Sequence, residues 1–191
     1  MVIVPKKIGK WQICVDYREL NKETLKAHFP LPFIDQVLDT LIGKKFFSFL
    51  DGFSGYIQIQ ITPKDQDKTA LTCPWGTFAY RVLPLGLCNA PATFQSVILG
   101  IFSDLLDNSV EIYMDDFTPY GGSFEEGLAN LEKVLKRCKK IHVSLSTTKC
   151  HMMREEGVVL GHLLSAAGIQ VDCQGKGNYA FYCTQDIDSS T

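Results

Sequence analysis

The sequence predicts an α+β fold in which an antiparallel sheet packs on helices. Two observations indicate this class. Short strand-like runs are mixed with amphipathic helical segments, and the two kinds follow no regular strand-helix-strand repeat. The 191 residues are 46% hydrophobic and 21% charged, which is the composition of a folded domain that can bury a core. We therefore expect one compact domain, or two lobes of one.

The N-terminal third is predicted to contain a hairpin, a helix and two strands. Residues 2–21 alternate apolar and polar side chains around a glycine turn, a pattern typical of a hairpin. Apolar side chains recur at helical spacing over 33–41 and predict a helix. The apolar run 45–50 predicts a buried strand that leads directly into Asp51. Residues 56–61 alternate cleanly and predict a half-buried strand.

The middle of the chain is predicted to form an antiparallel pair and then a helix. Residues 69–73 and 77–83 read as the two strands, turned at Pro74-Trp75-Gly76. Asn89 is placed to cap the helix that follows, with a proline in its first turn. The apolar side chains of this helix predict its buried face: Phe94, Val97, Ile98, Ile101, Phe102 and Leu105.

The next segment is predicted to be a hairpin over 110–120, followed by a second helix. Ser123 and Glu126 have the spacing of a capping box. The buried stripe of this helix is predicted to consist of Leu128, Leu131, Leu135 and Cys138. Residues 143–145 and 158–164 predict short strands, the second broken by Gly161.

Three aspartates are the candidate functional residues. Asp115 and Asp116 lie between two apolar runs, and Asp51 ends an apolar strand and precedes Gly52. Alone, the Asp-Asp pair also fits a solvated turn. If the two strands are neighbours in one sheet, the three carboxylates meet at one edge. They can then hold two divalent cations about 4 Å apart, as in-line phosphoryl or nucleotidyl transfer requires. Such hard oxygen ligands suit Mg²⁺.

Charge and cysteine content exclude several classes of protein. A net charge of −2 argues against binding nucleic acid by bulk positive charge. Seven scattered cysteines without a C-x-x-C pair indicate reduced thiols and an intracellular protein. The chain contains no apolar run of about 18 residues and no signal-peptide core, so we expect neither a membrane nor a secreted protein.

Four motifs in order carry a resemblance to a known family. They are Val-Asp-Tyr-Arg-Glu-Leu-Asn-Lys at 15–22, Phe-Leu-Asp-Gly-Phe-Ser-Gly-Tyr at 49–56, Leu-Pro-Leu-Gly-Leu-Cys-Asn-Ala-Pro-Ala-Thr-Phe-Gln at 83–95 and Tyr-Met-Asp-Asp at 113–116. Over residues 1–172 the chain resembles the reverse transcriptases of gypsy-type (Metaviridae) LTR retrotransposon Pol polyproteins. The resemblance implies the fingers and palm of a right-hand polymerase, with an antiparallel, ferredoxin-like palm sheet packed on helices.

The resemblance also implies a chemistry, partners and site residues. Asp51, Asp115 and Asp116 would be catalytic and would bind two Mg²⁺ ions, replaceable by Mn²⁺, with help from the Gly52 carbonyl. The partners would be deoxynucleotides (dNTPs) and an RNA or DNA template with a primer, inside the cell in cytoplasmic particles or the nucleus. The implied dNTP-binding residues are Lys6, Lys7, Gln12, Tyr56, which would act as a steric gate, Leu85, Gly86 and Lys149. The implied primer grip is Leu160, Gly161 and His162.

Three departures from the family pattern raise the alternative of an impaired remnant. Gln12 replaces an arginine, and a neutral amide cannot replace a guanidinium on a triphosphate. Pro119 lies in a predicted strand, where it removes a ladder hydrogen bond and would distort the hairpin of the acids. After Asp172 the family continues into a thumb, a connection and an RNase H domain, whereas residues 173–191 lose periodicity. Our hypothesis for this tail is a frameshift or disorder, which DNA sequencing would test.

Three functions therefore remain open from the sequence. The first is an RNA-directed DNA polymerase that adds dNTPs to a primer 3′-hydroxyl by two-metal chemistry. The second is a catalytically impaired remnant or nucleic-acid-binding module that keeps the fold. The third, an RNA-templated RNA polymerase, fits the acids but not Tyr56 or the whole motif set.

Overall fold

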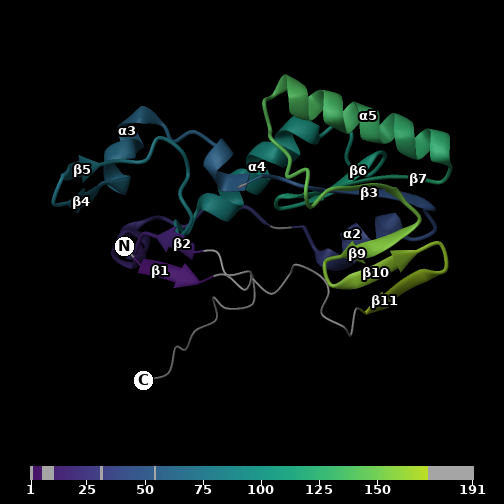
Figure 1. The fold of residues 1–191 in the computed structure, drawn as a ribbon, viewed down its shortest axis with the longest axis horizontal. Helices are drawn as coiled ribbons and strands as arrows, with labels where there is room; N and C mark the ends of the chain where they lie inside the picture. Colours follow the sequence, from purple (N-terminus) through teal and green to yellow (C-terminus); the bar gives the residue numbers. More distant parts are fainter. Residues whose placement is uncertain (1, 6–10, 31, 54, 172–191) are drawn as a thin grey trace.

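The computed structural model describes residues 2–5, 11–30, 32–53 and 55–171, and it confirms an α+β fold (Figure 1). Its centre is a four-stranded antiparallel sheet in the order β6-β7-β3-β8. The strands are β3 (Phe46–Asp51), β6 (Val110–Tyr113), β7 (Asp116–Gly121) and β8 (His151–Arg154). The predicted hairpin at 110–120 is β6–β7, and β3 lies directly beside it.

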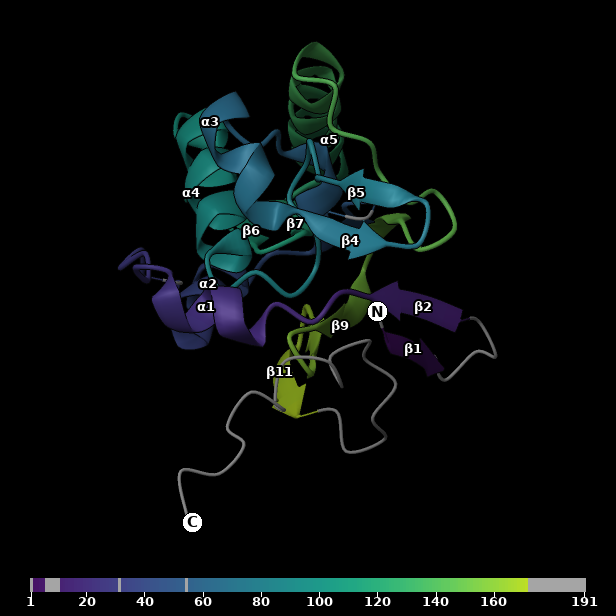
Figure 2. The same ribbon diagram turned by 90° about the vertical axis from the view of Figure 1, so that its left-hand side faces the viewer.

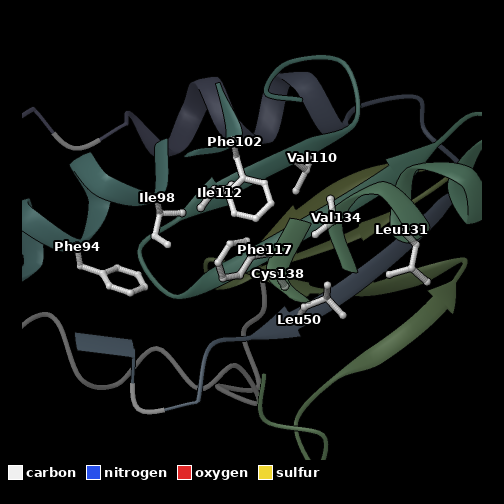
Figure 3. Close-up of a cluster of buried hydrophobic side chains, with 10 residues drawn as sticks. All are labelled: Leu50, Phe94, Ile98, Phe102, Val110, Ile112, Phe117, Leu131, Val134 and Cys138. Atoms are coloured by element: carbon white, nitrogen blue, oxygen red, sulfur yellow. The ribbon is translucent and has the colours of Figure 1, made fainter. Parts of the chain in front are cut away.

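Two helices cover one face of this sheet, α4 (Ala90–Phe102) and α5 (Phe124–Lys140) (Figure 1). Between them and the sheet lies a core cluster in which the Phe102 and Phe117 rings are 5.4 Å apart (Figure 3). Each fully buried side chain of this size stabilises the fold by about 1.5–3 kcal/mol. The buried members are Leu50, Phe94, Ile98, Phe102, Val110, Ile112, Phe117, Leu131, Val134 and Cys138.

The opposite face of the sheet is also covered, by α2 (Ile34–Leu41) and a small antiparallel sheet. That sheet has the order β11-β10-β9 and consists of β9 (Glu156–Val159), β10 (His162–Ser165) and β11 (Gly168–Val171). Val37, Leu38 and Leu41 of α2 belong to a second core cluster that also contains Phe47 and Tyr120. The central sheet is therefore buried on both faces.

The remaining elements lie at one end of the molecule, where Figure 2 shows the β4–β5 hairpin facing the viewer. The strands are β1 (Val2–Pro5) with β2 (Trp11–Cys14), and β4 (Leu71–Cys73) with β5 (Gly76–Phe78). The helical pieces are α1 (Arg18–Glu23), η1 (Gly55–Gln58), α3 (Pro63–Gln66) and η2 (Asp67–Thr69). Both hairpins were predicted, although the sequence pattern extended each of them too far.

Several predictions about elements and burial were wrong. Residues 56–61 do not form a strand, because the chain turns into the 3₁₀ helix η1. Residues 143–145 contribute one isolated bridge, from Leu145 to Gly52. Two side chains predicted to be buried are exposed, Val97 (37%) and Leu128 (48%). The capping box is partly confirmed: Ser123 accepts from the Glu126 amide, but the Glu126 carboxylate accepts from Gly122.

Pro119 interrupts the sheet without disturbing the hairpin of the acids. The β6–β7 pairing runs without a break from Val110–Pro119 to Tyr113–Asp116. On the other side, β3 and β7 keep one register, but the four described residues Ser48, Phe49, Thr118 and Pro119 form no pairs in it. Because proline has no amide hydrogen, a lost ladder bond was expected. The expected distortion beside Asp115 and Asp116 is not observed.

Two further observations bear on the expected class of protein. Within the described ranges, no helix is both long enough and apolar enough to cross a membrane. The described cysteines 73, 88, 138 and 150 are free thiols.

Candidate active site

The three predicted aspartates lie at one edge of the central sheet. Asp51 is the last residue of β3 and lies opposite Asp116, the first residue of β7. Asp115 immediately precedes Asp116 in the turn, and its carbonyl accepts a 2.7 Å hydrogen bond from the Gly52 amide. The predicted meeting of the two acidic segments at one edge is thus confirmed.

The turn that carries Asp115 is held by a buried glutamine from α4. Met114 has a φ of 56°, a left-handed conformation that costs a non-glycine residue about 1–2 kcal/mol. Its amide donates to Gln95 Oε1 over 2.6 Å, and Gln95 Nε2 donates to the Ile112 carbonyl over 3.3 Å. Gln95 is completely buried. Its carboxamide therefore fixes both ends of the bend that presents the two acids.

A second glutamine ties the loop after Asp51 to the segment that follows α5. The Asp51 carbonyl accepts from the Ser146 amide over 2.8 Å. Gln58 Oε1 accepts from the Ser144 amide over 2.7 Å, while Gln58 Nε2 donates to the Phe53 carbonyl over 2.6 Å. These bonds hold the backbone that follows Asp51. Gly52 lies close to the turn that carries Asp115. A Cβ at this position would lie 3.2 Å from the Asp115 carbonyl oxygen.

Lys149 supplies the counter-charge for Asp51. Its Nζ lies 2.8 Å from Asp51 Oδ2, where the carboxylate side chain is only 18% exposed. The hydrogen bond to Asp51 raises the pKa of Lys149, and the nearby charges of Asp115 and Asp116 raise it further. The ammonium group thus occupies a position that suits a cation.

The donor set fits a hard cation, although the side chains do not converge on one point. Asp51, Asp115 and Asp116 offer only oxygen atoms, which Mg²⁺ prefers. Among the described residues, no three His, Cys, Asp or Glu side chains are grouped closely enough to hold a metal ion. The backbone therefore brings the three acidic residues to one edge of the sheet. In this structure Lys149 neutralises the charge of Asp51.

Tyr56 packs against the core cluster under α4 and α5, and the loop at 83–86 lies beside the N-terminal elements. The Tyr56 ring packs edge-on against Phe94, with centroids 5.6 Å apart. Gly86 has a φ of 103°, and its carbonyl accepts from Asn21 Nδ2 over 2.8 Å. Leu85 is 42% exposed beside it. Asn21 therefore anchors this loop to α1.

The predicted primer-grip residues form the tight turn between β9 and β10. Val159 and His162 pair across the turn, and Leu160 and Gly161 have φ values of 49° and 76°. Two consecutive left-handed residues are the signature of a type I′ hairpin turn. The Leu160 side chain is buried in the second core cluster, and His162 Nδ1 lies 2.9 Å from the Leu160 carbonyl oxygen.

Three predicted site residues are not placed with the others. Lys6 and Lys7 lie outside the described residues. The backbone of Gln12 lies in β2 opposite Val4, and its side chain also falls outside the description.

Sequence reasoning missed the supporting roles of Gln95, Gln58 and Asn21. Gln95 had a usable signal, since it is a polar residue among the apolar side chains of the predicted helix. Gln58 and Asn21 had none, because Ser144 lies 86 residues from Gln58 and Gly86 lies 65 residues from Asn21 in the chain.

Comparison with known proteins decides the family. Residues 4–164 match the family described as reverse transcriptase (RNA-dependent DNA polymerase). The chain belongs to the reverse transcriptase family.

Curated relatives of this reverse transcriptase domain are polyproteins of retrotransposons. The retrovirus-related Pol polyprotein from transposon 412 of Drosophila melanogaster is 36% identical over 178 residues, or 90% of this chain and 14% of the polyprotein. The transposon Tf2-3 polyprotein of Schizosaccharomyces pombe is 34% identical over 174 residues, or 91% of this chain and 13% of that one. The reverse transcriptase domain thus spans a small part of each relative's length.

Solved structures support the same assignment of fold. The foamy viral protease-reverse transcriptase in complex with an RNA/DNA hybrid is similar, with a TM-score of 0.80 and 27% identity. The match covers 88% of this chain and 22% of that one. A second foamy viral structure, in complex with double-stranded DNA, has a TM-score of 0.81 and 28% identity and matches 88% of this chain and 30% of that one.

Proposed function

We propose that this domain is an RNA-directed DNA polymerase that adds dNTPs to the 3′-hydroxyl of a primer. The observation that carries the proposal is the register of the sheet, which sets Asp51 directly opposite Asp116 with Asp115 beside them. Membership in the reverse transcriptase family supports the same reaction.

In this proposal Asp51, Asp115 and Asp116 hold two Mg²⁺ ions, with the Gly52 carbonyl as a further ligand, and Mn²⁺ can replace them. When bound, the ions would activate the primer hydroxyl and neutralise the leaving pyrophosphate. The Lys149 ammonium group, which is paired with Asp51 in this structure, would donate a proton to the pyrophosphate oxygen.

The nucleotide would lie between the acids and the loop at 83–86. Tyr56 would contact the sugar and exclude a 2′-hydroxyl, since its ring is fixed by Phe94. Leu85 and Gly86 would pack beside the base. Lys6 and Lys7, with the weaker help of Gln12, would contact the triphosphate.

The nucleic acid partner would be a template-primer duplex of RNA or DNA. The foamy viral proteins are similar to this chain, and their structures hold an RNA/DNA hybrid and double-stranded DNA. Leu160, Gly161 and His162 would contact the primer strand, because they form a rigid turn at the end of a hairpin.

Primer extension on an RNA template with a DNA primer tests the proposal, in Mg²⁺ and separately in Mn²⁺. We expect metal-dependent dNTP incorporation that Asp115→Asn abolishes. Asp35→Asn changes an exposed aspartate on α2 in the same way and should retain activity, so it is the matched control. Absence of dNTP incorporation by the folded chain at high enzyme concentration would refute the proposed polymerase function.

A second candidate is a nucleic-acid-binding domain without catalysis. The ion pair between Lys149 and Asp51 favours it, because it neutralises an acid that metal would need. This function predicts salt-sensitive binding of template-primer by a folded chain that incorporates no dNTP in either metal.

A further inference from the structure

A cavity of about 390 Å³ lies between α2 and β6, at the β6 edge of the central sheet, where Leu99 of α4 also lines it. Pro32, Val37, Leu99 and Leu106 give it apolar walls. Its volume is within the range of small-molecule sites, about 300–1,000 Å³. The polymerase function proposed above assigns it no role.

The floor of this cavity carries a buried carboxyl group, that of Glu111. Its neighbours in β6, Val110 and Ile112, belong to the core cluster under α4 and α5 (Figure 3). Because successive strand residues point to opposite faces, Glu111 is directed toward α2 and lines the cavity. Only 7% of Glu111 is exposed, and its Oε1 has no hydrogen-bond partner.

Two further acids line the cavity. Asp39 of α2 and Asp107 before β6 are both exposed at its rim. None of the lining residues that the structure describes is a lysine or an arginine. A buried acid with a free oxygen, next to two more acids, calls for a cation.

The surroundings of Glu111 reinforce this need. Burial and, to a lesser degree, the charge of Asp107 raise the pKa of Glu111 to about 7, against hydrogen bonds from the Asp107 backbone and the Thr40 side chain that oppose the rise. On the same side of the sheet, the Tyr120 hydroxyl is also buried and without a described partner.

We propose that this cavity binds an alkylammonium group, with the amine on Glu111 and rim contacts to Asp39 and Asp107. The apolar walls fit a methylene chain, and the buried acid fits the ammonium group at its end. A metal ion fits less well, because the described acids are not grouped closely enough to share one. Two sources have this chemistry, a free polyamine and a lysine side chain.

Calorimetric titration of the folded chain at about pH 8.5, where Glu111 is ionised, tests the proposal. The probes are spermidine and N-acetyl-lysine amide, used separately. The variants are Glu111→Gln and, as the matched control, Glu155→Gln, which removes an exposed acid outside the cavity. We expect saturable binding of at least one probe, weakened about tenfold or more in Glu111→Gln and unchanged in Glu155→Gln.

The two probes separate the sources. Binding of spermidine alone indicates a free polyamine, and binding of the capped lysine indicates a side chain. The proposal is overturned if neither probe saturates at about 10 mM, a concentration that would reveal even weak binding. Equal binding by the wild type and Glu111→Gln would also overturn it, because that result indicates unspecific attraction to acidic surface. No polymerase activity is needed, so this test stands apart from that of the proposed function.

Discussion

Replacing Glu111 with glutamine is expected to stabilise the protein above neutral pH and to change little near pH 4. The folded-state pKa of Glu111 is raised from 4.5 to about 7 by burial, so the folded protein holds this proton more tightly than the unfolded chain. Stability therefore falls as pH rises through the window between these two values and levels off above it. Glutamine resembles the protonated acid but does not titrate.

The expected gain in stability follows from the difference between the folded-state and unfolded-state pKa values of Glu111. About 2.5 pH units separate 4.5 from about 7. At 1.36 kcal/mol per unit, the penalty above pH 7 is ~3 kcal/mol. The difference in unfolding free energy between variant and wild type should rise from near zero at pH 4 to this value at pH 8.

Urea unfolding followed by circular dichroism, repeated at each pH unit from 4 to 8, measures this difference. Asp39 and Asp107 also line the cavity, but they are present in both proteins, so they do not account for a difference between them. Glu155→Gln should show a flat difference across the same range. A Glu111→Gln difference that does not change with pH would refute the argument, since the buried carboxyl would then titrate normally.

Three further predictions concern the site and its supports. Gln95→Leu leaves a buried amide and a buried carbonyl without partners, so urea unfolding should show a loss of about 2–4 kcal/mol; a smaller loss than 1 kcal/mol contradicts its role. Gly157→Ala would place a Cβ 2.1 Å from the Phe49 ring, and thermal unfolding should show destabilisation of about 1–3 kcal/mol that Phe49→Leu relieves. Lys149→Met removes the ammonium that competes for the acids, so calorimetry should show tighter Mg²⁺ binding; unchanged affinity would mean that the ion pair does not compete.

Sequence reasoning was most successful where burial follows chain periodicity. The β6–β7 hairpin and both long helices were predicted from apolar spacing, and their buried faces were largely correct. It was wrong at residues 56–61, whose perfect alternation belongs to no strand. There Gln58 bonds to Phe53 and to Ser144, and the contact with Ser144, 86 residues away, is one that a local pattern does not contain. Helix α1 was missed because it buries no residue and so has no apolar stripe.

The candidate site was predicted by residue type, but its supports depend on pairings that no local pattern contains. Asp51 and Asp116 could be expected at one edge only if their strands were neighbours, and the register confirms that they are. The bond from Lys149 to Asp51 joins residues 98 positions apart. The hydrogen bonds of Gln95 to Met114 and Ile112 likewise join separate elements, so no local pattern predicts them.

The interruption at Pro119 divides the β3–β7 ladder into two short blocks. One block, Leu50–Phe117 and Asp51–Asp116, adjoins the acids, and the other, Phe46–Gly121 and Phe47–Tyr120, adjoins the second core cluster. Local openings of a protein follow contiguous bonded units, so the two blocks can exchange their amide hydrogens at different rates. Binding of a ligand at the acidic edge should therefore slow amide hydrogen exchange in the first block and leave exchange in the second block unchanged. Hydrogen exchange would then distinguish binding at the site from local opening elsewhere in the fold.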